Sequence, residues 1–251
     1  MSGIRTSNAQ APNVKLRKES RAHAQSNLAW LEQALEQLED KQQGGPSLLL
    51  LGGRDPISFR LRVAQSHARH DLTPSHWSHV VLLERNGPGL SSVEAWEISL
   101  TPVNGFGYPP RTNGIQRADL NAYANEERYP NVALVHVPLE LHKVKAARER
   151  FMRQRAVVDA VGLVTEWLPY VWGVGRNINP LLEGHGLPCA AMAEVILGAA
   201  GFELTPSVAS RSSSPEAIWQ SARWWHDYHG SDSRQPLTGT YHTPHTLCTA
   251  D

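Results

Sequence analysis

Residues 186–197 read GLPCAAMAEVIL, and this apolar stretch with its single cysteine decides how the chain is interpreted. The pattern predicts an apolar helix that starts near Cys189 and ends at Gly201, since glycine is common just after a helix C-terminus. At a helix N-terminus, unpaired N–H groups and the helix dipole favour the thiolate form of a cysteine. Taken alone, however, a cysteine on an apolar helix is most often a small buried hydrophobe. Its chemistry depends on the partners that the rest of the chain supplies.

Two upstream segments supply an imidazole and a carboxylate. Residues 78–84 read SHVVLLE and predict a strand that His79 opens, and residues 93–98 read VEAWEI and predict a second strand that carries Glu94. The NGPG sequence at 86–89 is a strong turn signal, so the two strands are expected to form a hairpin. A thiol, an imidazole and an orienting acid are the parts of a cysteine nucleophile. Glu94 can fix the imidazole tautomer if the strand register allows contact.

Alternatives exist for each of these parts. His76 competes with His79 as the base, and Glu97 competes with Glu94, although a strand's period of two places Glu97 on the opposite face from Glu94. The backbone N–H of Cys189 is a candidate oxyanion donor. Tyr170 is a candidate for the second donor or for a substrate contact.

The N-terminal part of the chain predicts a helix over 16–42. Its leucines are spaced 3, 4, 3, which is an a/d stripe less than two heptads long: Leu28, Leu31, Leu35 and Leu38. Docking of this helix on the domain core is favoured over a dimer or a partner contact through it. A buried strand at 47–51 and a helix at 56–68 follow, with Asp55 as the N-cap.

The remaining segments divide the chain into regions. A strand is expected at 131–137, a long helix at 140–166 and a loop at 169–187. The expected organisation is a disordered N-terminus (1–15), an N-terminal helix (16–45), a catalytic domain (46–230) and a polar C-terminal tail (231–251).

Composition narrows the classes of partner and compartment. The chain has 24 Lys+Arg and 24 Asp+Glu among 251 residues, and this balance argues against nucleic acid as the main partner. Two cysteines do not make a disulfide framework and suit a reducing compartment. No signal-peptide core or membrane-length apolar window is visible. The expected location is cytoplasmic, or outside the cell through a specialised secretion system.

The C-terminal segment offers a rival chemistry, because four histidines and Cys248 fall between 226 and 248. Zinc uses such ligands, but the spacing matches no recognised zinc module. We therefore expect neither a metal nor a cofactor.

The order of these segments resembles the permuted NlpC/P60 group (YiiX-like) of papain-like cysteine hydrolases. The similarity spans roughly residues 46–220 and is carried by short motifs in a fixed order: Ser78-His79-Val80, Val93-Glu94-Ala95, residues 135–139 (VHVPL), Pro169-Tyr170 and residues 188–195 (PCAAMAEV). The family has Ser and Glu in the two positions after the cysteine, and here they are Ala190 and Ala191. Any substrate contact made by those family positions does not carry over.

The resemblance implies a function. It implies an α+β, papain-like fold, in which an antiparallel sheet packs against the helix that bears Cys189, with an N-terminal helical extension. It also implies a thiol hydrolase that cleaves an amide bond in a peptide, an amino-acid amide or a peptidoglycan-type peptide through a Cys189 thioester, with His79 as base and Glu94 as orienter. The alternatives are a thiol acyltransferase or lipid ester hydrolase of the lecithin:retinol acyltransferase type, an inactive binding module, and an effector role.

Overall fold

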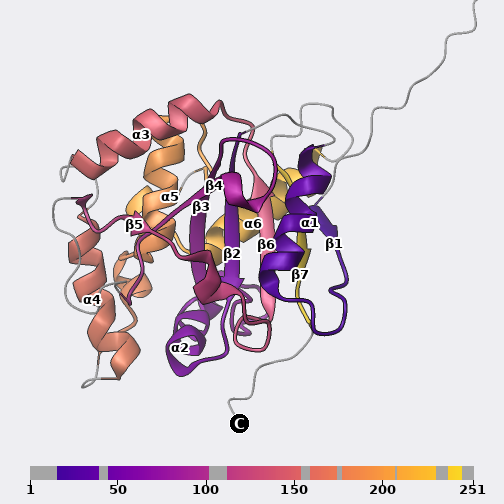
Figure 1. Ribbon diagram of the computed structural model, residues 1–251. Helices are drawn as coiled ribbons and strands as arrows, with labels where there is room; N and C mark the ends of the chain where they lie inside the picture. Colours follow the sequence, from indigo (N-terminus) through magenta and orange to yellow (C-terminus); the bar gives the residue numbers. More distant parts are fainter. Residues whose placement is uncertain are drawn as a thin grey trace, which may run out of the picture.

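The centre of the protein is an open, mostly antiparallel sheet, whose strands lie side by side across the middle of Figure 1. The computed structural model describes residues 16–39, 45–101, 112–153, 159–173, 177–206, 208–229 and 237–244. Within these ranges the strand order is β1-β7-β6-β2-β3-β4-β5, and only the β1–β7 pair is parallel. The strands are β1 (Leu16–Lys18), β2 (Gly45–Gly52), β3 (His79–Arg85), β4 (Val93–Glu97), β5 (Gln116–Arg117), β6 (Asn131–His136) and β7 (Thr238–His242).

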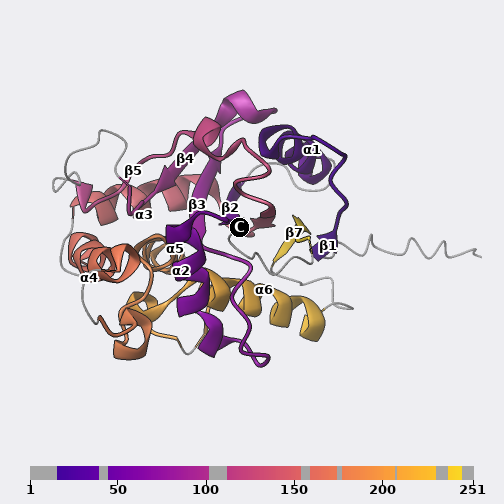
Figure 2. The same cartoon turned by 90° about the horizontal axis from the view of Figure 1, so that it is seen from below.

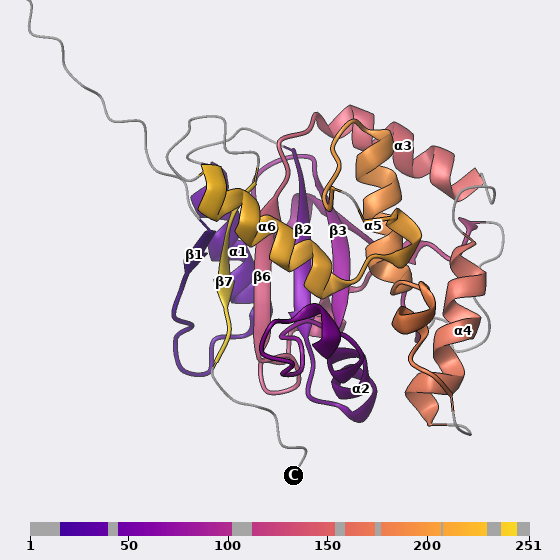
Figure 3. The same ribbon diagram turned by 180° about the vertical axis from the view of Figure 1, so that it is seen from behind.

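Helices cover both faces of this sheet, so the molecule is a mixed α+β structure. They are α1 (Asn27–Glu39), α2 (Pro56–Ala64), α3 (Leu141–Arg153), α4 (Ala160–Trp172), α5 (Pro188–Ala199) and α6 (Pro215–His229), with short 3-10 turns η1 (Ser66–Ala68), η2 (Leu90–Ser92), η4 (Leu120–Tyr123), η5 (Pro180–Glu183) and η6 (Ser210–Ser212). Seen from below, α1 lies on one face, and α2, α5 and α6 lie on the other (Figure 2). From behind, α6 crosses the middle strands and α5 runs beside β3 (Figure 3).

Strand β2 explains why the sheet is buried on both faces. Its four consecutive leucines alternate between two cores, because successive side chains of a strand point to opposite faces. Leu48 and Leu50 belong to the core beneath α5 and α6, and Leu49 and Leu51 belong to the core beneath α1. A continuous leucine run is the pattern of a strand buried on both sides.

The N-terminal helix is shorter than its sequence suggested. It begins at Asn27 rather than near residue 16, and Leu16 to Lys18 form β1 instead. The leucine stripe is used inside the chain: Leu31, Leu35 and Leu38 are buried against the sheet. Docking on the core therefore accounts for the stripe.

Two strands from distant parts of the sequence, β1 and β7, are neighbours in the sheet. Strand β7, from the expected polar tail, pairs with β1 in parallel, with Leu16 opposite Gly239. Strands β7 and β1 thus extend the sheet beyond β6. The expected disorder of residues 1–15 lies outside the described residues.

Other expectations hold in part. The hairpin of β3 and β4 is confirmed, and so is the Asp55 cap of α2, whose side chain accepts from the Ser58 N–H at 3.0 Å. The long helix expected over 140–166 is instead two helices, α3 and α4. The expected loop at 169–187 starts later, because Pro169 to Trp172 form the last turn of α4.

Among the described residues, no helix is both long and apolar enough to cross a membrane.

Candidate active site

Cys189 stands in the first turn of α5, at the wall of a cavity. Helix α5 starts with Pro188, which has no N–H to leave unpaired, so Cys189 supplies one of the first free backbone donors of the helix. Its side chain is unbridged and only 3 % of the residue is exposed. The cavity has a volume of about 110 Å³, and both Cys189 and His79 line it.

The segment that leads into α5 is tightly fixed. The Leu187 N–H donates to the Ser213 carbonyl at 2.9 Å, and the indole N–H of Trp167 donates to the Gly186 carbonyl at 2.8 Å. Gly186 is required here, because a Cβ at this position would lie 2.3 Å from the Ser213 carbonyl oxygen. These contacts determine where the Cys189 side chain enters the cavity.

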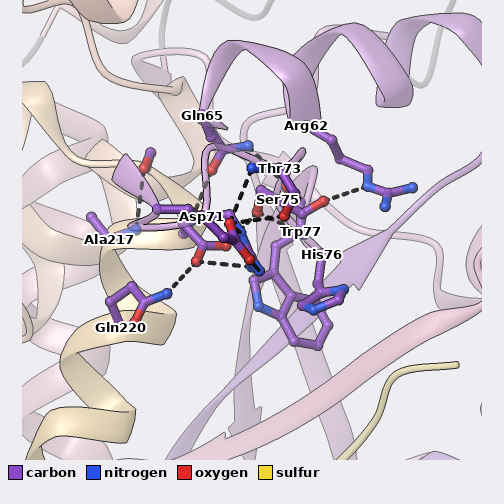
Figure 4. A network of polar contacts seen from close by, with 12 residues as sticks. Arg62, Gln65, Asp71, Thr73, Ser75, His76, Trp77, Ala217 and Gln220 are labelled. Carbon is purple, nitrogen blue, oxygen red and sulfur yellow. Dashed lines mark hydrogen bonds and ion pairs between the residues drawn. The ribbon is translucent and has the colours of Figure 1, made fainter. Parts of the chain in front are cut away.

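A second network fixes the loop that leads into His79. The Ser75 hydroxyl donates to Glu216 at 2.6 Å, and the Gln65 side chain donates to the Trp77 carbonyl at 2.8 Å (Figure 4). The Glu216 N–H in turn donates to Gln65 at 2.8 Å, so α2, the loop and α6 are joined. Glu216 is fully buried, and burial raises its pKa. The network therefore braces the strand that presents the imidazole.

His79 and Glu97 form the polar centre of the site. The His79 Nε2 lies 2.8 Å from a Glu97 carboxylate oxygen, and the Glu97 side chain is only 4 % exposed. Burial lowers the pKa of His79, but the charge of Cys189 and hydrogen bonds with Cys189 and Glu97 outweigh it and raise that pKa to about 10. Since Nε2 faces Glu97, the other ring nitrogen, Nδ1, is the one left for the thiol.

Two further side chains hold Glu97 in place. The Tyr123 hydroxyl donates to the same Glu97 oxygen as His79 at 2.5 Å, and the Gln116 amide donates to the other oxygen at 3.0 Å. Burial alone would raise the pKa of Glu97, but hydrogen bonds from His79, Tyr123 and Gln116 and the His79 charge lower it. A carboxylate held at both oxygens keeps the ring orientation of its histidine.

Strand register explains why Glu97, and not Glu94, meets His79. Leu82 pairs with Trp96 and Glu84 pairs with Glu94, so Glu94 lies five positions along β3 from His79. At about 3.4 Å per residue this offset is about 17 Å. Continuing the same register places Glu97 diagonal to His79 on one face, within reach of long side chains. The expectation that Glu94 orients His79 is therefore wrong, and Glu97 is the carboxylate that contacts His79.

Glu94 occupies a different environment. Its carboxylate forms an ion pair with Arg117, and its side chain is 35 % exposed. Such surface pairs contribute little free energy.

The two auxiliary candidates, Tyr170 and His76, both contact tryptophans. Tyr170 is in the last turn of α4, where its ring meets Trp167 edge-on at 5.6 Å, and His76 lies beside Trp77 with ring centroids 6.3 Å apart. Neither is among the described residues that line the Cys189 cavity. Tyr170 and His76 are thus not part of this cavity wall, whereas Tyr123 lines it. The polar residues around Tyr123 in the sequence gave no signal of that position.

The described residues contain no group of three or more His, Cys, Asp and Glu side chains suited to a metal ion. In the histidine-rich C-terminal segment, His242 Nδ1 lies 3.0 Å from the Glu19 carbonyl oxygen, which ties β7 to the chain after β1. His245 and Cys248 lie outside the described residues.

The assembled side chains have the layout of a cysteine nucleophile. A buried cysteine at a helix start shares a cavity wall with a histidine, and the histidine contacts a buried carboxylate. This arrangement can form and cleave an acyl thioester.

No protein-family model matches the chain, and no curated protein matches it.

Proposed function

We propose that the protein is a thiol hydrolase that cleaves amide bonds, with Cys189 as nucleophile, His79 as proton carrier and Glu97 as the orienting carboxylate. The observation that carries the proposal is the setting of His79, a partly buried imidazole that bonds Glu97 and lines one cavity together with Cys189. A cysteine that only fills space in an apolar core does not require a histidine and a carboxylate beside it.

The chemistry proceeds in two halves. The Cys189 thiolate attacks the substrate carbonyl carbon, and the resulting oxyanion is stabilised by the Cys189 backbone N–H. The His79 imidazolium gives its Nδ1 proton to the leaving nitrogen as the C–N bond breaks, which leaves a thioester on Cys189 and a free amine. A water then attacks the thioester, His79 takes the proton of that water, and the carboxylic acid product departs with the thiolate restored.

The permuted NlpC/P60 (papain-like) family is the relation that best accommodates this site. The order of the His79 strand, the β3–β4 hairpin and the Cys189 helix along the chain supports it, as does an antiparallel sheet against which the Cys189 helix packs. Under this proposal the family's acidic role falls to Glu97, three residues after the Glu94 that matches the motif. Peptides, amino-acid amides and peptidoglycan-type peptides are the substrates that the family relation suggests.

Acyl-enzyme trapping tests the proposal. The protein is incubated with each member of a panel of peptidyl 4-nitroanilides and matched 4-nitrophenyl esters, and each reaction is quenched in acid. Intact mass spectrometry then measures the mass of the protein. The proposal predicts an added acyl mass on Cys189 with at least one amide, and none in Cys189→Ala. The variant Cys248→Ser serves as the matched control and keeps the adduct. Acylation by esters alone, with transfer to an added amine or alcohol, would favour an acyltransferase instead.

A further inference from the structure

The cavity beside Cys189 is apolar on one side and charged on the other. Its apolar wall comes from α2, from the segment after β4 and from the N-cap of α5: Ile57, Leu61, Ile98, Leu100 and Leu187. Among the described residues that line the cavity, Arg128 is the only arginine or lysine. Arg128 is exposed, so its positive charge lies where the cavity meets solvent.

The position of Arg128 is fixed relative to the proposed base. Its guanidinium carbon lies 5.4 Å from the centre of the Tyr129 ring, Tyr129 meets Tyr123 at 5.2 Å, and Tyr123 meets His79 at 5.7 Å. A guanidinium stacked on an aromatic ring is held in orientation while its N–H groups stay available at its edge. The backbone is held as well, since the Arg128 carbonyl accepts from the Arg54 N–H at 2.9 Å.

The acidic group that lines this cavity, Asp55, and the one that bonds His79, Glu97, are already engaged. Both oxygens of Asp55 are bound by Ser58, through its backbone N–H at 3.0 Å and its hydroxyl at 2.7 Å. Glu97, behind His79, is held by His79, Tyr123 and Gln116. No described carboxylate forms an ion pair with Arg128. Within the described part of the chain no carboxylate neutralises its charge, which can therefore meet a ligand.

We propose that Arg128 is a specificity residue that selects substrates carrying a carboxylate close to the bond that Cys189 attacks. The inference rests on the proposed thiol chemistry and adds the substrate class: an acyl compound with an apolar group for the Ile57 and Leu61 wall and an anionic group for Arg128. The planar guanidinium can bind a carboxylate through two parallel hydrogen bonds, which neutral amides cannot match.

Paired alkylating reagents test this without knowledge of the substrate. N-iodoacetylglycine and N-iodoacetylglycinamide differ only in a carboxylate against a carboxamide, and both react with a thiol. The ratio of their second-order rate constants at Cys189, measured in a Cys248→Ser background, reports how strongly the cavity prefers the anion. The account predicts that Arg128→Gln lowers this ratio by about two- to fivefold, the range for a solvent-exposed ion pair.

Arg54→Gln is the matched control, because Arg54 is an exposed neighbour whose backbone bonds Arg128 but whose side chain is not among the cavity-lining residues. It changes the net charge by the same amount and is expected to leave the ratio unchanged. Arg128→Lys, which keeps the charge but loses the planar fork, is expected to fall between the wild type and Arg128→Gln.

The outcomes separate the two proposals. An equal ratio in wild type and Arg128→Gln, with Cys189 still reactive in both, overturns the role of Arg128 and leaves the thiol chemistry intact. An equal drop in Arg54→Gln also overturns it, because the effect is then one of net charge. A Cys189 that fails to react with the neutral reagent in the folded protein overturns the proposed function itself.

Discussion

The β3–β4 hairpin holds an ion pair near each of its ends, and the two pairs differ in what surrounds them. At one end, Arg148 binds both oxygens of Glu84 at 2.7 and 3.1 Å, and its guanidinium lies 4.0 Å from the centre of the Trp96 ring. At the other end, His79 lies 2.8 Å from Glu97.

The Glu84–Arg148 pair is sealed, meaning that it is buried and lines no part of the Cys189 cavity. The His79–Glu97 pair is open, because His79 lines that cavity together with Cys189. Glu84 has no exposed surface and neither Glu84 nor Arg148 lines the Cys189 cavity, so the pair joins α3 to the sheet and can do no chemistry there. His79 can lose its proton, and it faces both the cavity and Cys189. Burial of a charged group alone therefore does not identify an active site. A titratable partner, a nucleophile and access to ligand are also needed.

The largest expected effect is on chemistry at the open end. His79→Asn keeps a similar side-chain size but removes the proton carrier. We expect the hydrolytic kcat/KM to fall by about 10²- to 10⁴-fold, the range for a general acid–base group. Hydrolysis assays on the best substrate of the acylation panel measure this, with thermal unfolding to verify that the variant is folded. A rate within threefold of wild type would contradict the assignment.

The next largest effect is expected on the unfolding free energy, through the sealed Glu84–Arg148 pair. Arg148→Met leaves the Glu84 carboxylate buried without its partner, which typically costs about 3–5 kcal/mol of unfolding free energy. Urea denaturation measures the loss, and the alkylation rate of Cys189 in the folded fraction is expected to stay at the wild-type value. The double variant Glu84→Met/Arg148→Met removes the stranded charge and should recover part of the stability. A stable Arg148→Met would show that the pair contributes little.

A smaller effect distinguishes the two acids of β4. Glu97→Gln removes the charge beside His79, and hydrogen bonds to charged groups contribute about 1.5–3 kcal/mol, so we expect Cys189 alkylation to slow by about 10- to 100-fold. Glu94→Gln is the matched control. Its carboxylate pairs with Arg117 at the surface, and we expect a change of less than about twofold. The reverse ranking would restore Glu94 as the orienting acid.

The smallest effect is a pH dependence of stability that only the open pair should show. The pKa of His79 is raised to about 10 in the folded protein from 6.5, so its contribution is fully present below pH 6.5 and is lost as the pH rises through 10. The wild type should thus lose more unfolding free energy than His79→Asn between pH 7 and pH 10.5. Urea unfolding at both pH values measures the difference. Parallel losses in the two proteins would contradict the raised pKa.

Local sequence patterns anticipated the elements that carry the site but not their contacts. The cap at Asp55, the turn at 86–89 and the apolar helix of Cys189 are encoded by adjacent residues, so they could be predicted. The choice between Glu94 and Glu97 depends on register, which pairing across the turn decides and which no single strand reveals.

Contacts between residues far apart in the sequence could not be predicted, because they too depend on pairing that no local segment reveals. Strand β1 is three residues long and pairs with β7 more than 200 residues later, so nothing near Leu16 indicates a strand. Tyr123 lies in a polar segment and becomes part of the site only because η4 places its hydroxyl on Glu97.

The most direct test of the Cys189–His79–Glu97 assignment is the pH dependence of Cys189 alkylation by iodoacetamide, measured in a Cys248→Ser background with and without His79→Asn. The account predicts a reaction that stays fast below pH 7 in the presence of His79, because the imidazolium stabilises the thiolate, and that becomes slow in His79→Asn. A cysteine that reacts only after denaturation, or equally fast in both proteins, would contradict the account and make Cys189 a residue of the core.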